Sequence, residues 1–127
     1  MLQYMLDTNI CIYVIKSRPV ELREQFNRLT EQICVSTITL AELYYGVEKS
    51  SRRAQNLRVP ASKPCRFRSR QLPTTGQVRA ELERAGQLAG PHDMLIGAHA
   101  RSEGLIVVTN NIREFERIPG LRIENWV

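Results

Sequence analysis

Three short apolar runs that end abruptly at polar residues predict buried β-strands. They cover residues 4–6, 33–35 and 105–108. Their side chains are apolar throughout instead of alternating with polar ones, which favours parallel strands buried on both faces. A weaker run at 121–124 predicts a last strand.

Helical spacing of apolar residues fills the intervals between these runs. The predicted helices cover residues 9–16, 20–29, 40–47, 76–85 and 91–103, with a short helical turn at 114–115. We expect Thr37 or Thr39 to cap the third helix, Pro91 to lie in the first turn of the fifth, and Gly86 to end the fourth. Strands that alternate with helices predict an α/β fold with a doubly wound parallel sheet flanked by helices. A length of 127 residues fits a single domain, 1–127.

Basic residues and prolines concentrate in one segment. The net charge is +5, but eight of the 18 Lys and Arg residues lie within 50–80, where no acidic residue occurs. The rest of the chain has ten basic and 13 acidic residues, and therefore a net charge of −3. Three prolines within 59–75 exclude a continuous helix or central strand there. We therefore expect an irregular Pro/Arg-rich segment at about 58–74. It is either an arm that contacts phosphates or a solvated insertion, and its composition favours the insertion.

The remaining composition narrows the setting. Three scattered cysteines form neither a disulfide framework nor a zinc spacing, so a reducing, cytoplasmic location is expected. No apolar run reaches the ~20 residues that span a bilayer, and the N-terminus lacks a signal pattern, so no membrane association is expected.

Candidate chemistry lies where the predicted strands end. Asp7, Ser36 and Asn111 each follow a strand, and ligands of open α/β sheets gather at the carboxyl ends of strands. Glu42 is the only charged residue within 40–47, and Asp93 follows a Gly-Pro pair at a helix start.

Each carboxylate also has a purely structural explanation. Glu42 could reach solvent or pair with Lys49, Asp93 could stabilise a helix N-terminus, and Asp7 could form an Asx turn and cap. Three carboxylates from separate segments at one end of a sheet nevertheless repel one another unless a cation lies between them, and Mg²⁺ or Mn²⁺ takes such oxygen ligands. His92 and His99 lack partners at metal-ligand spacing, so we interpret them as local polar residues.

Four motifs carry a family resemblance. They are Met-Leu-Asp-Thr-Asn at 5–9, Ser-Thr-Ile-Thr-Leu-Ala-Glu-Leu at 36–43, Gly-Pro-His-Asp at 90–93, and Val-Val-Thr-Asn-Asn at 107–111 followed by Arg-Glu-Phe at 113–115. In this order they resemble the PIN-domain ribonucleases, specifically the VapC-type toxins of type II toxin–antitoxin systems in their enteric, transfer-RNA-cleaving subgroup. The resemblance covers roughly 1–57 and 74–127.

The resemblance implies a PIN-like doubly wound sheet and an endoribonuclease that depends on magnesium or manganese. It implies transfer RNA as substrate, at the anticodon loop of the initiator, together with a cognate antitoxin and a homodimer.

The resemblance also assigns roles to single residues. Asp7 would bind the metal directly, Asp93 would bind it directly or through water, and Glu42 would complete the catalytic acids and orient the attacking water. The supporting residues would be Thr8, Asn9, Thr109, Asn111 and Glu114. The fourth acidic position of many PIN domains falls at Asn111 here, and the sequence leaves open whether Asn111 or Glu114 fills that role.

The chain departs from the family between Leu57 and Gly76. The family has a helix end, a buried strand and a helix start there, whereas this segment looks like one translated in another reading frame. A missing strand would cost several kcal/mol of folding stability. The alternative function is therefore a catalytically impaired module that still binds antitoxin. A phosphotransfer or phosphatase domain is disfavoured, because no second Asp follows two residues after Asp7 and no lysine lies near the end of the last apolar run.

Overall fold

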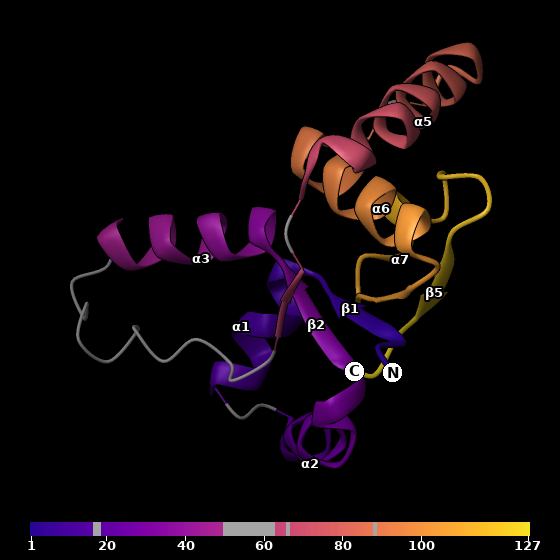
Figure 1. Ribbon diagram of the computed structural model, residues 1–127. Helices are drawn as coiled ribbons and strands as arrows, with labels where there is room; N and C mark the ends of the chain where they lie inside the picture. The colour runs from indigo at the N-terminus through magenta and orange to yellow at the C-terminus, as the bar shows by residue number, and fades with distance from the viewer. Residues whose placement is uncertain (17–18, 50–62, 66, 88) are drawn as a thin grey trace.

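A parallel five-stranded sheet with strand order β3-β2-β1-β4-β5 forms the centre of the molecule in the computed structural model (Figure 1). The structure describes residues 1–16, 19–49, 63–65, 67–87 and 89–127. The strands are β1 (Tyr4–Leu6), β2 (Ile33–Ser36), β3 (Lys63–Cys65), β4 (Ile106–Val108) and β5 (Arg122–Glu124). All four pairings are parallel, so the predicted doubly wound α/β fold is confirmed.

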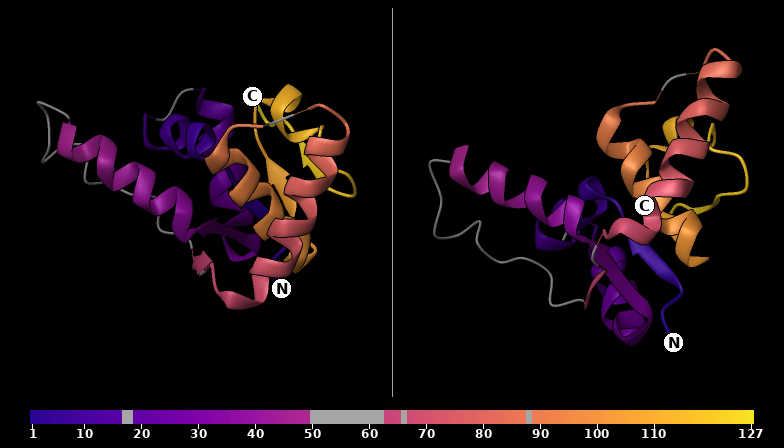
Figure 2. Two further views of the ribbon diagram at one scale, coloured as in Figure 1. Left: turned by 90° about the horizontal axis from the view of Figure 1, so that it is seen from above. Right: turned by 45° about the horizontal axis from the view of Figure 1, so that its top comes forward.

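Helices cover both faces of the sheet. They are α1 (Thr8–Lys16), α2 (Val20–Leu29), α3 (Thr37–Lys49), α5 (Leu72–Arg84), α6 (Pro91–Glu103) and α7 (Ile112–Phe115), with 3-10 turns at Thr30–Gln32 and Ser69–Gln71. Leu6 and Val35 pack with α1 and α2 on one face, whereas Met5 and Val107 pack with α5 and α6 on the other. Alternate residues of β1, β2 and β4 therefore fill two separate cores, which explains why the runs at 4–6, 33–35 and 105–108 are apolar throughout. Figure 2 shows α5 and α6 side by side on their face.

Gly86 ends its helix as predicted, whereas neither of the predicted threonines caps one. Gly86 and Gly104 follow α5 and α6 with φ of 66° and 68°, a left-handed conformation that glycine adopts without strain. Thr37 and Thr39 lie inside α3, so the prediction that one of them caps this helix is wrong. The hydroxyl of Ser36 accepts the Ile38 N–H instead, at 3.2 Å.

The prediction of an irregular segment through residue 74 is also wrong where the structure describes it. Residues 63–65 form the edge strand β3, and α5 begins at Leu72 instead of residue 76. Pro64 is tolerated because an edge strand needs no ladder on its outer side, and Pro73 lies in the first turn of α5, where no N–H is required. The edge strand that the sequence was expected to lack is therefore present in a short form. The rest of the segment, 50–62, lies outside the described residues.

A membrane span is not found in the part of the chain that the structure describes, since none of its helices combines the necessary length and apolarity.

Candidate active site

Asp7 lies at the carboxyl end of β1, next to the end of β4. This is the point where the chain order of the sheet reverses, which is the usual ligand position in such folds. Its side chain is buried: Oδ1 accepts the Ile10 N–H at 2.8 Å, and Oδ2 accepts the Thr109 hydroxyl at 2.5 Å. Asp7 thus makes the helix-capping contact that its structural explanation required, and Thr109 contacts it directly.

Burial raises the pKa of Asp7 to about 6. The hydrogen bonds from Thr109 and Ile10 act in the opposite direction, while the negative charges of Asp93 and Glu42 raise the pKa further. The pKa of Asp93 is raised by burial and by the charges of Glu114 and Glu42, and the nearby His92 lowers it in part. The three carboxylates predicted from separate segments therefore lie close enough to interact electrostatically.

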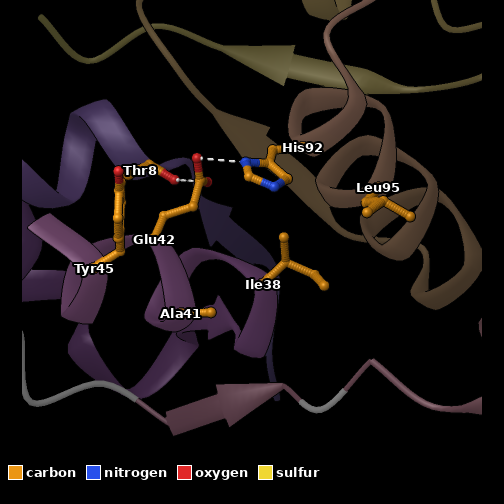
Figure 3. A pocket seen from close by; sticks show the side chains of 7 residues that line it. All are labelled: Thr8, Ile38, Ala41, Glu42, Tyr45, His92 and Leu95. Atoms are coloured by element: carbon orange, nitrogen blue, oxygen red, sulfur yellow. Dashed lines mark hydrogen bonds and ion pairs between the residues drawn. The ribbon is translucent and has the colours of Figure 1, made fainter.

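Glu42 is held by two groups from other elements. Its Oε1 accepts the Thr8 hydroxyl at 2.6 Å, and its Oε2 lies 2.9 Å from Nδ1 of His92 (Figure 3). Lys49, the alternative partner, instead places its ammonium 5.1 Å from the ring centre of Tyr45. The interpretation of His92 as a merely local polar residue is therefore wrong. Its position directly before Asp93, in the same helical turn, was the available sequence signal.

Asp93 lies in the first turn of α6, as predicted, and both candidates for the fourth acidic role lie near it. The Asn111 side chain donates a long hydrogen bond to Asp93 (3.5 Å), and its backbone N–H donates to the Thr109 hydroxyl (2.8 Å). Glu114 accepts the Gly90 N–H at 3.4 Å and lies 3.7 Å from the Arg117 guanidinium. Asn9 is exposed on α1, and the structure does not bring it into this network.

A divalent cation fits these residues by charge and by donor chemistry. Among the described residues, no Lys or Arg forms an ion pair with Asp7 or Asp93, so their charges lack a counterion there. The described residues also contain no group of three or more His, Cys, Asp or Glu side chains arranged to hold a metal by themselves. Magnesium commonly uses only one or two carboxylates, with water and substrate oxygens completing its coordination. Asp7 and Asp93 meet that smaller requirement.

Ser36 contributes to structure instead of to this acidic cluster. Its hydroxyl lies 3.0 Å from Nδ1 of His99, and both side chains are buried. Burial lowers the pKa of His99, and the Phe67 ring packs edge-on against it at 5.5 Å. A substrate cannot reach a fully buried hydroxyl, so Ser36 is excluded as a nucleophile in this arrangement.

Comparison with known proteins assigns the family. The family model of the PIN domain matches residues 4–121. The chain belongs to the PIN-domain family. Within that family it is 53% identical over 131 residues to the tRNA(fMet)-specific endonuclease VapC of Salmonella typhimurium, with 99% of both chains covered. It is 52% identical to ribonuclease VapC2 of Haemophilus influenzae, with 100% of both chains covered.

The fold comparison agrees with this assignment. The PIN domain superimposes on the crystal structure of DNA-bound VapBC from Salmonella typhimurium with a TM-score of 0.94, at 50% identity and with 100% of both chains covered. The resemblance to VapC-type ribonucleases is therefore confirmed.

Proposed function

We propose that this PIN domain, residues 1–127, is a magnesium- or manganese-dependent endoribonuclease toxin that hydrolyses phosphodiester bonds of transfer RNA. The observation that carries the proposal is the convergence of Asp7, Glu42 and Asp93 at the carboxyl end of the sheet. Such a concentration of negative charge would repel RNA unless a cation were present. A cation is therefore needed for RNA to bind as well as for its cleavage.

Asp7 and Asp93 would hold the ion, and Glu42 would act on water. A bound divalent ion supplies a Lewis acid for the phosphate oxygens and lowers the pKa of water. The short hydrogen bond from Thr8 fixes the carboxylate of Glu42, which then orients the attacking water toward phosphorus. Thr109 fixes Asp7 in the same manner, and Asn111 positions a water next to Asp93.

The relatives indicate the substrate and the partner. The similar Salmonella protein is specific for initiator transfer RNA by its name, and the superimposed structure is a VapBC complex from the same organism. By analogy, we propose the anticodon loop of initiator transfer RNA as substrate and a cognate VapB-type antitoxin as inhibitor. We also propose that the protein forms a homodimer. A cytoplasmic location completes the proposal, since transfer RNA functions in the cytoplasm.

The alternative, an impaired module that only binds antitoxin, depended on a missing strand. Residues 63–65 supply a strand at that edge, which removes the structural argument for impairment. The alternative remains as one outcome of the test.

The test is incubation of purified, antitoxin-free protein with total transfer RNA, with magnesium or with a chelator. We expect discrete fragments with magnesium, and none with chelator or in the variants Asp7→Ala and Asp93→Asn. Circular dichroism and gel filtration on the same samples show whether each variant is folded. Cleavage that survives Asp7→Ala would refute the site, whereas a folded wild-type chain that binds antitoxin without cleaving would support the impaired module.

A further inference from the structure

A cavity of about 440 Å³ lies between α3 and α6, beside the acidic cluster (Figure 3). Ile38 and Ala41 of α3 and Leu95 of α6 give it a mainly apolar lining, and Glu42 lies at its edge. Its volume is within the ~300–1,000 Å³ range of small-molecule sites. None of the roles proposed above for the catalytic residues uses this apolar space.

Two ring side chains stand on either side of Glu42 at this cavity. Tyr45 is 64% exposed and the His92 side chain 60% exposed, so both rings are available to a bound molecule. A large exposed tyrosine beside an apolar cavity is a natural stacking surface for a flat ring. The ammonium of Lys49, next to the Tyr45 ring, adds a positive charge that suits a phosphate.

The position of the cavity beside the acidic cluster indicates which kind of molecule it binds. Because Glu42 belongs both to the cavity lining and to the acidic cluster, a molecule that fills one reaches the other. Such a molecule needs a flat, largely apolar ring within one residue's length of a phosphodiester, and a nucleotide of single-stranded RNA has that combination.

We propose that this cavity binds one unstacked nucleobase of the RNA, adjacent to the phosphodiester that is cleaved. The inference rests on the proposed nuclease function and specifies how the substrate is recognised. Stacking tolerates different bases, so the cavity selects nucleotides that can leave a helix, such as those of a loop, over paired ones. Tyr45 is the main stacking residue and therefore a specificity determinant.

The test uses a synthetic RNA stem-loop that corresponds to an anticodon arm, intact or with a single abasic nucleotide on either side of the cleavage position. Wild-type protein, Tyr45→Ala and Tyr44→Ala are compared. Tyr44 is the matched control, because it is the neighbouring tyrosine of α3, is 54% exposed and does not line the cavity.

For wild-type protein and for Tyr44→Ala, we expect one abasic position to lower kcat/KM by about 5- to 140-fold, the range that loss of one base-stacking contact gives. Tyr45→Ala should lower kcat/KM on intact RNA by a similar factor, and the abasic position should then have little further effect. Equal cleavage of intact and abasic RNA by the wild type would overturn the proposal. So would an abasic effect that persists in full in Tyr45→Ala.

A binding measurement separates this proposal from the proposed function. With calcium in place of magnesium, since Ca²⁺ also binds carboxylate oxygens, fluorescence anisotropy of labelled RNA should give a Kd that is weaker for the abasic RNA with the wild type, and equal for both RNAs with Tyr45→Ala. That binding pattern without cleavage in magnesium would support the cavity and refute the nuclease. Cleavage without any base preference in either assay would support the nuclease and refute the cavity.

Discussion

Two clusters around carboxylates occupy this PIN domain, and they differ in how negative charge is neutralised. Glu103 of α6 accepts a hydrogen bond from the Gln71 side chain at 2.8 Å and pairs with the Arg70 guanidinium at 2.7 Å. At the other end of the same helix, Asp93 lies near two further carboxylates, and its charge has no basic partner of this kind among the described residues.

The difference separates a structural cluster, formed by Glu103, Gln71 and Arg70, from a functional one, the acidic cluster of Asp7, Glu42 and Asp93. Glu103 joins α6 to the turn before α5, and its charge is balanced within the chain. The acidic cluster at Asp7 and Asp93 is instead held in place by hydroxyl and amide donors that leave its charge in excess. Groups arranged at a cost to stability are a mark of binding and catalytic sites. The predictions below test this distinction, from the largest expected effect to the smallest.

Asp7→Asn should reduce cleavage of transfer RNA by at least ~10³-fold, since the loss of a metal ligand removes several kcal/mol of transition-state stabilisation. The melting temperature without divalent ions should stay the same or rise, because asparagine still caps α1 and the repulsion from Asp93 and Glu42 is removed. Steady-state cleavage and thermal melts measure both effects. A variant that is less stable but cleaves normally when folded would place Asp7 with the structural cluster.

The acidic cluster should also make stability depend on pH in an unusual direction. The pKa of Asp7 is raised from 3.8 to about 6, so the folded state binds more protons than the unfolded state between these values. The free energy of unfolding should therefore fall as pH rises from about 4 to 6, by roughly 2–3 kcal/mol from this group. Urea unfolding of wild-type protein and Asp7→Asn in chelator isolates this contribution as their difference. A difference that does not change with pH would contradict it.

Gln71→Ala should damage the structural cluster without affecting chemistry. Gln71 is buried, accepts the Arg68 N–H at 2.6 Å and donates to Glu103, so its loss should cost about 1–3 kcal/mol of unfolding free energy. Cleavage per folded molecule should remain within about twofold of wild type. Urea unfolding together with active-site-normalised kinetics measures the two effects, and a large drop in the cleavage rate of folded protein would break the distinction between the clusters.

Arg70→Ala should have the smallest effect, below about 1 kcal/mol. The Arg70 side chain is 67% exposed, and solvent screens such ion pairs. Comparison with Gln71→Ala by urea unfolding shows which partner holds Glu103. A larger loss for Arg70→Ala would mean that the ion pair, and not the amide, is the main stabilising contact.

The sequence predicted most of the sheet and the acidic residues because those signals are local. An apolar run such as 105–108 is expected to be buried whatever its neighbours in the fold are, and Asp7 directly follows the similar run at 4–6. The edge strand β3 was missed because three residues with a central proline form a strand only when a neighbour, β2, offers a free edge. The contact of His92 with Glu42 joins residues 50 positions apart, so it depends on the packing of α6 against α3. The same packing creates the cavity beside Tyr45, which no spacing along the chain indicates.

Direct titration of Mn²⁺ into the purified protein tests most directly whether the acidic cluster needs an external cation. Electron paramagnetic resonance of the free ion gives the number of ions bound and their Kd. We predict saturable binding by the wild type and by Gln71→Ala, and at least ~10-fold weaker binding by Asp7→Asn and Asp93→Asn, as loss of a ligand requires. Binding that is absent from the wild type, or unchanged in both aspartate variants, would contradict the account.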